Sequence, residues 1–203
     1  TSSSRNPNSQ TLYTDKYHPD YDRIYGYYRD VGALGGSYIE KVTIADGATV
    51  VPAYLFSGAA LLESVTIPDS VLEIGSYAFY NCKSLTSVII PDKVRTIGYA
   101  AFVNCNLLAN ITIGSLVNKI DISAFEGCVS LTSVTIPNSV TELGACAFSG
   151  CTNLSSISLG TGLKTLGYAI FEECTSLKTL TLPAVTSSSR NPNSQTLYTD
   201  KYH

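Results

Sequence analysis

The chain has 203 residues and a formal net charge of −3; 14% of its residues are charged and 44% are hydrophobic. This apolar content suffices for a folded core, whereas a chain disordered throughout would be poor in hydrophobic and rich in charged residues. The weakly acidic charge lacks the basic footprint that nucleic acids and anionic membrane surfaces require. No run of about 18 apolar residues occurs, so no membrane-inserted segment is expected.

Residues 1–11 are rich in Ser, Asn and Pro, and Arg5 is their only charged side chain. This composition predicts an extended linker. Residues 12–38 follow as a predicted connector or cap. Residues 13–28 of this segment include six tyrosines: Tyr13, Tyr17, Tyr21, Tyr25, Tyr27 and Tyr28. Pro19 and Gly26 interrupt the four-residue spacing of the first four, so irregular or short extended structure is expected rather than a helix.

A 23-residue period organises positions 39–185. Six full units span 39–176 and a partial unit follows, each reading approximately L-x-S-V-x-I-P-x-x-V-x-x-I-G-x-x-A-F-x-x-C-x-x. The phenylalanine and cysteine columns of this repeat are the predicted structural core: Phe56, Phe79, Phe102, Phe125, Phe148 and Phe171, with Cys82, Cys105, Cys128, Cys151 and Cys174. Columns of Leu, Val and Ile keep the same register, so the sequence predicts one repetitive architecture rather than separate domains.

The apolar residues at unit positions 1, 4 and 6, together with the I-P, I-G and A-F-x-x-C elements, resemble the BspA-like (Treponema pallidum type) leucine-rich repeat. The resemblance covers residues 39–185. It implies a leucine-rich-repeat solenoid, a right-handed parallel β coil that is mostly β with short turns and 3-10 segments. One departure from classical leucine-rich repeats is the lack of an Asn column after the strand.

The residue pattern agrees with this expectation. In residues 133–136 (Ser-Val-Thr-Ile), apolar side chains alternate with hydroxyl side chains, which predicts a strand with one buried and one wet face. Pro68, Pro91 and Pro137 end their strands, because proline donates no ladder hydrogen bond. A glycine such as Gly144 is expected to make the next turn. One unit cannot bury its own apolar face, so the units are expected to stack.

Two columns of the repeat, the cysteines and the outward-facing hydroxyl residues, are candidates for a chemical role. Stacked cysteines have parallel Cβ vectors, which disfavours disulfides, so the five column cysteines are interpreted as buried apolar fillers; Cys146 lies off the column and is expected to be more accessible. The outward strand face carries a row of hydroxyls without aromatic residues, and its simplest interpretation is structural. A ligand surface remains the alternative, formed by Thr43, Thr66, Thr112, Thr135 and Thr181.

Catalysis has little support in the sequence. The two histidines are His18 and His203, and no Ser/His/Asp order, G-x-S-x-G, phosphate-binding glycine loop or H-E-x-x-H motif occurs. The acidic segment 15–22 matches no EF-hand spacing and is interpreted as a solvated loop. The chain is therefore expected not to be an enzyme, with no catalytic residue, no metal site and no cofactor.

Residues 186–203 are identical to residues 1–18 at all 18 positions, an offset of 185 (186 − 1). The 23-residue units differ freely from one another, so this identity needs a separate cause. The favoured interpretation is that the chain is one stretch of a longer tandem array whose module has 185 residues. The alternative is that one end was duplicated or engineered. Tyr198 and Tyr202 would then begin the docking segment of a next module.

The resemblance implies an extracellular or cell-surface protein involved in adhesion. The leading hypothesis is a structural or adhesive protein that forms a filament of tandem or head-to-tail modules, with itself as the main partner and a host or microbial surface protein or glycan as a further one. The tyrosines of residues 12–38, which could cap their own solenoid or dock on a neighbour, are the expected module interface. The alternative is a ligand-binding adhesin or receptor that uses the Ser/Thr strand face.

Overall fold

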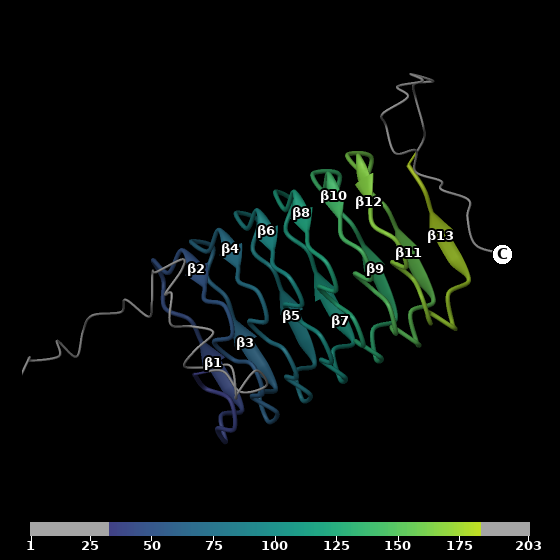
Figure 1. The fold of residues 1–203 in the computed structure, drawn as a ribbon. Helices are drawn as coiled ribbons and strands as arrows, with labels where there is room; N and C mark the ends of the chain where they lie inside the picture. Colours follow the sequence, from purple (N-terminus) through teal and green to yellow (C-terminus); the bar gives the residue numbers. More distant parts are fainter. Residues whose placement is uncertain (1–32, 184–203) are drawn as a thin grey trace, which may run out of the picture.

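A computed structural model of the protein describes residues 33–183 (Figure 1). The described residues form a parallel β solenoid without a helix, which confirms the predicted fold class. The linker 1–11, most of the connector 12–38 and the copy 186–203 lie outside the described residues. So do all eight tyrosines predicted at the module interface: Tyr13, Tyr17, Tyr21, Tyr25, Tyr27, Tyr28, Tyr198 and Tyr202.

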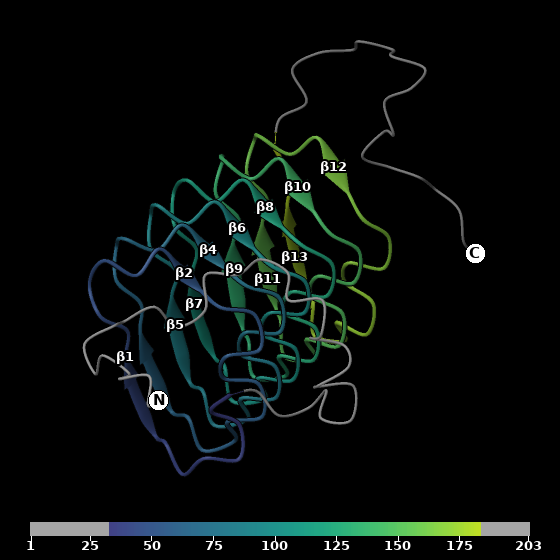
Figure 2. The same ribbon diagram turned by 60° about the vertical axis from the view of Figure 1, so that its left-hand side comes forward.

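Each coil of the solenoid contributes a three-residue strand and then a two-residue strand on the opposite side (Figures 1 and 2). The three-residue strands are β1 (Lys41–Thr43), β3 (Ser64–Thr66), β5 (Ser87–Ile89), β7 (Asn110–Thr112), β9 (Ser133–Thr135), β11 (Ser156–Ser158) and β13 (Thr179–Thr181). The two-residue strands are β2 (Val50–Val51), β4 (Glu73–Ile74), β6 (Thr96–Ile97), β8 (Lys119–Ile120), β10 (Glu142–Leu143) and β12 (Thr165–Leu166).

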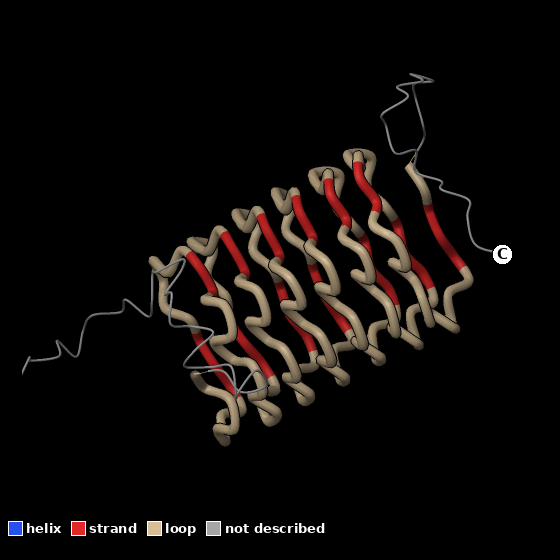
Figure 3. The backbone as a smooth tube through the Cα atoms, viewed as in Figure 1, coloured by secondary structure: helices blue, strands red, loops and turns tan. Residues whose placement is uncertain are grey.

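The repeat length sets the register of every sheet. Val42 pairs with Val65, and Glu142 pairs with Thr165, so each residue pairs with its equivalent in the next unit. The two-residue strands form one six-stranded sheet from β2 to β12. The three-residue strands form two sheets, β1-β3-β5-β7 and β9-β11-β13, which follow one another along the same side of the solenoid (Figure 3).

The phenylalanine column forms a ring stack through the centre of the molecule. Phe79 and Phe102 have centroids 4.9 Å apart at 7°, and Phe102 and Phe125 have centroids 5.2 Å apart at 9°. Five of the six phenylalanines are buried, and Phe171 at the C-terminal end of the column is half-buried. The column therefore acts as a continuous core in which each ring packs between the rings of adjacent coils.

The column cysteines pack in the core and also form hydrogen bonds to the backbone of the preceding coil. Each thiol reaches back one coil to a phenylalanine carbonyl; Cys105 Sγ lies 3.1 Å from the Phe79 oxygen and Cys128 Sγ 3.2 Å from that of Phe102. All six cysteines are free thiols, as the sequence interpretation expected. Burial raises the pKa of Cys82 to about 12, only partly offset by a backbone hydrogen bond involving Ala59. Cys82 therefore stays protonated at neutral pH. The thiols add a second hydrogen bond to carbonyls that already accept a backbone N–H, as those of Phe79 and Phe102 do from Cys82 and Cys105.

The expected glycine turn has a different physical basis. Gly144 has no left-handed φ; instead, a Cβ placed there would lie 2.4 Å from the backbone nitrogen of Ile122 in the preceding coil. The left-handed conformation falls two residues later, with φ between 52° and 60°, on residues that are not glycine: Tyr54, Tyr77, Ala100, Ser123, Cys146 and Ala169. Close coil packing, not backbone conformation, thus requires the glycine.

Candidate functional site

The Ser/Thr strand face is exposed along the three-residue strands. Thr66, Thr112 and Thr135 are exposed, as are Thr43 and Thr181 at the two ends of the face. Ile89 interrupts the hydroxyl row with 70% of its surface exposed. The structure therefore places the predicted threonines in one row on this face, one coil apart from Thr43 to Thr66 and from Thr112 to Thr135, with Ile89 and Ser158 at the two intervening positions.

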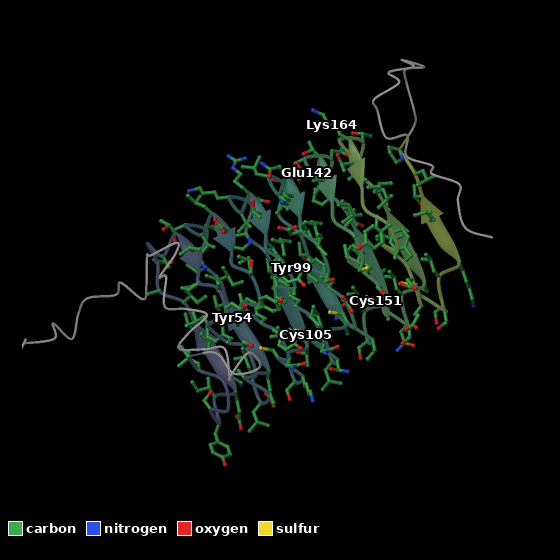
Figure 4. All side chains as sticks on the ribbon, in the orientation of Figure 1. Tyr54, Tyr99, Cys105, Glu142, Cys151 and Lys164 are labelled. Carbon is green, nitrogen blue, oxygen red and sulfur yellow. The ribbon has the colours of Figure 1, made fainter. Side chains whose placement is uncertain are left out.

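A tyrosine cluster lies on another edge, where the chain leaves the six-stranded sheet. Tyr54 stacks on Tyr77 with centroids 4.6 Å apart, and Tyr80 and Tyr99 meet Tyr77 edge-on at 5.6 and 5.0 Å. Figure 4 labels Tyr54 and Tyr99. Burial raises the pKa of Tyr77, and a hydrogen bond with Tyr99 adds to the shift. The cluster is thus a neutral aromatic surface, a composition that is common at recognition sites.

A groove of about 520 Å³ lies at the C-terminal end of the six-stranded sheet. Three consecutive coils line it with equivalent residues, among them Lys119, Glu142 and Thr165 on the strands, and Ile122, Ala145 and Tyr168 on the adjoining ridge. Ala145 is the small residue between two larger ones, since Ile122 is 44% and Tyr168 78% exposed. Lys119 Nζ lies 3.3 Å from Asp121 and 3.9 Å from Glu142, so the groove pairs one cation with two carboxylates.

Cys146, expected to be the more accessible thiol, is half-buried behind this ridge. Desolvation raises its pKa, and the carboxylates of Glu126 and Glu172 raise it further. Nucleophilic cysteines need the opposite surroundings, with nearby positive charge that stabilises the thiolate. The position therefore does not favour a reactive thiol.

The described part of the chain contains neither a candidate metal site nor a helix that could span a membrane. Within residues 33–183, no group of three or more His, Cys, Asp or Glu side chains is placed to hold a metal ion. The same residues contain no helix long and apolar enough to span a bilayer. His18, His203 and the acidic segment 15–22 lie outside the described range.

The repeat geometry defines a leucine-rich-repeat protein. The model of the BspA-type leucine-rich repeat region matches with six copies over residues 32–144 and 118–194. The chain therefore belongs to the BspA-type leucine-rich-repeat family, whose members are typically surface-associated. No curated protein matches the chain.

Two crystal structures show the same architecture. A Treponema pallidum leucine-rich-repeat protein is 36% identical with a TM-score of 0.70, over 76% of this chain and 74% of that one. A Bacteroides ovatus leucine-rich-repeat protein is 30% identical with a TM-score of 0.58, over 70% of this chain and 45% of that one. The chain thus spans less than half of the Bacteroides protein.

Sequence reasoning missed the tyrosine cluster and the groove. Their residues stand at neighbouring positions of the repeat, where no column keeps one residue type from unit to unit. Reading equivalent positions of adjacent units side by side would have shown Tyr54 beside Tyr77, and Ala145 between Ile122 and Tyr168. The 23-residue period sets which residues of adjacent units become neighbours, so the sequence did contain the information needed to find both features.

Proposed function

We propose that this protein is an extracellular structural or adhesive surface protein, one module of a tandem or head-to-tail leucine-rich-repeat filament. The observation that supports the proposal most strongly is the apolar edge of the last described coil. Leu180 and Leu182 of this coil are 44% and 38% exposed, although they occupy columns that are buried in the preceding coil. A further coil stacked on this edge would bury both residues, as it does elsewhere in the solenoid.

The terminal identity supports the same proposal. Eight units of the 23-residue repeat make 184, one fewer than the offset of 185 between the identical segments. Successive modules of that length would keep the coil register to within one residue. Contacts between two different ends also propagate as filaments when the rotation between copies does not close a ring. In this proposal the tyrosines of residues 12–38 supply the other side of the joint.

Assembly of the chain in solution tests the proposal. We expect sedimentation velocity to show concentration-dependent, elongated oligomers for the wild-type chain. Leu180→Lys places a charge on the apolar edge and should abolish them. Leu116→Lys is the matched control, because Leu116 is similarly exposed at 40% but lies in the middle of the solenoid. A wild-type chain that stays monomeric, or a Leu180→Lys chain that assembles normally, would contradict the proposal.

A ligand-binding adhesin or receptor module is the second candidate function. The supporting observation is the exposed threonine row on the three-residue strands, which offers regularly spaced hydroxyls to a surface protein or glycan. Such a module would be monomeric and bind one partner saturably. Replacing Thr66, Thr112 and Thr135 with Lys should then abolish binding to the target surface while leaving the circular dichroism spectrum unchanged. Undiminished binding by this variant would exclude the strand face as the binding surface.

A further inference from the structure

The groove at the end of the six-stranded sheet combines a polar strip with an aromatic wall. Lys119, Glu142 and Thr165 pair in register on β8, β10 and β12, so they follow one another at the strand spacing of roughly 4.8 Å. Tyr168 lies beside them with 78% of its surface exposed. The groove volume of about 520 Å³ falls within the range of about 300–1,000 Å³ that small-ligand sites occupy. The groove therefore has the size and the mixed lining of a ligand site.

The charges in the groove favour a neutral ligand rich in hydroxyl groups. Lys119 Nζ contacts Asp121 Oδ2 and Glu142 Oε2, and Asp121 Oδ1 accepts the Ile122 N–H at 2.8 Å. Glu142 keeps 55% of its side chain exposed, so its carboxylate can accept hydrogen bonds from two neighbouring hydroxyls (Figure 4). The one negative charge in excess disfavours an anion, and the ammonium of Lys119 disfavours a second cation at the same carboxylates.

An extended peptide matches this groove less well than a sugar chain does. The strands β8, β10 and β12 pair with one another in parallel register, so their backbone groups bond within the sheet. A peptide that adds to a sheet needs a free edge, whereas the groove crosses the face of these three strands. The face offers side chains in place of backbone partners, and these are hydrogen-bonding groups beside one aromatic ring. Recognition here therefore depends on hydroxyl groups and on stacking.

We infer that the groove binds a neutral, extended polysaccharide that runs along the solenoid axis. One residue of an extended β-linked chain has nearly the length of one coil step, so successive sugars meet successive coils. The C–H face of a pyranose ring packs on Tyr168, because the face of an aromatic ring is electron-rich. Gly144 and Ala145 leave room for that ring between the walls formed by Ile122 and Tyr168. This site is separate from the threonine row and rests on neither function proposed above.

Titration of the monomeric chain with hexasaccharides tests the inference. Cellohexaose, mannohexaose and chitohexaose are neutral, β-1,4-linked and extended, whereas maltohexaose has the composition of cellohexaose but a coiled, α-linked shape. We expect at least one extended sugar to bind in calorimetry and to shift the amide resonances of residues 119–122, 142–145 and 165–168. Maltohexaose should bind about tenfold more weakly.

Three results would overturn the inference. The first is that none of the extended sugars binds, or that maltohexaose binds equally well. The second is that the groove resonances shift with protein concentration alone, which would assign the groove to a second copy of the chain. The third is that a tetra-arginine peptide shifts them and the sugars do not, which would make the groove a cation site.

Variants of the groove identify the binding residues. Tyr168→Ala and Glu142→Ala should each weaken sugar binding about tenfold, because they remove the stacking ring and the hydroxyl acceptor. Tyr168→Phe keeps the ring and should bind nearly as the wild-type chain does. Glu73→Ala is the control, because Glu73 occupies the same repeat position as Glu142 but lies in β4, outside the groove. Undiminished binding by both groove alanine variants, with unchanged circular dichroism spectra, would overturn the assignment. Because the measurement uses monomers, it is independent of whether the filament proposal holds.

Discussion

The coil of β11 and the coil of β13 have the same sequence pattern but different surroundings. Ile157 is 2% exposed and its equivalent Leu180 is 44% exposed; Leu159 is 5% exposed and its equivalent Leu182 is 38% exposed. The Leu159 N–H donates to the Thr181 oxygen at 2.9 Å, whereas no strand follows β13 among the described residues to accept from Leu182. Burial in this solenoid is thus a property of the interface between coils, not of the repeat unit.

The phenylalanine stack should show the largest difference between middle and end. Phe125 packs between two rings at 5.2 and 5.3 Å, whereas Phe171 is half-buried and stacks on Phe148 at 6.4 Å. We expect Phe125→Ala to lower the free energy of unfolding by about 3–5 kcal/mol, because it empties a fully buried site. Phe171→Ala should cost clearly less in the same urea titration. Equal costs would show that the end coil is as well packed as the middle.

The buried thiols should make stability fall at alkaline pH. Burial raises the pKa of Cys82 from 9.0 to about 12, so between these values the unfolded chain loses the thiol proton while the folded chain keeps it. The contribution is fully present below pH 9 and declines by about 1.4 kcal/mol per pH unit above it. We expect Cys82→Ser to flatten the decline in urea titrations between pH 9 and 10.5.

The end of the thiol column provides the control for this prediction. Cys174 is only half-buried, and desolvation raises its pKa with a backbone hydrogen bond involving Cys151 opposing the shift. Cys174→Ser should therefore flatten the alkaline decline less than Cys82→Ser. If Cys82→Ser leaves the slope of the wild-type chain unchanged, the buried thiol does not control stability in this range.

The smallest expected effect concerns backbone conformation in the turn that precedes β13. Glu173 has a φ of +58°, at a position where Gly127 and Gly150 stand in other coils. A left-handed residue with a Cβ costs roughly 1–2 kcal/mol, so Glu173→Gly should raise the melting temperature despite the flexibility that glycine adds to the unfolded chain. The adjacent Glu172→Gly should lower it. Parallel shifts of the two variants would argue against backbone strain at Glu173.

The sequence was sufficient to predict the fold because a single 23-residue period determines how the coils stack. The spacing of Phe79, Phe102 and Phe125 sets the register, and the alternation in residues 133–136 sets which side chains face inward. The left-handed column could not be predicted, because Tyr77, Ala100 and Ser123 occupy it where glycine would have been the signal. The carbonyl partners of the cysteines also required the structure, since each thiol bonds a residue 26 positions away.

The binding features were harder to predict for a related reason. The tyrosine cluster and the groove depend on which side chains become neighbours when units of unequal sequence stack. Ala145 creates a groove only because Ile122 and Tyr168 stand one coil to either side. No single unit contains that information, and no repeat column reveals it.

Amide hydrogen exchange at the two equivalent strands tests the central claim most directly. We expect the Leu182 amide to exchange rapidly in a dilute sample and to become protected as the concentration rises and another copy covers the edge. The Leu159 amide, already bonded to Thr181, should stay protected throughout. Exchange at Leu182 that is independent of concentration up to the solubility limit would contradict the claim that this edge is a joint between modules.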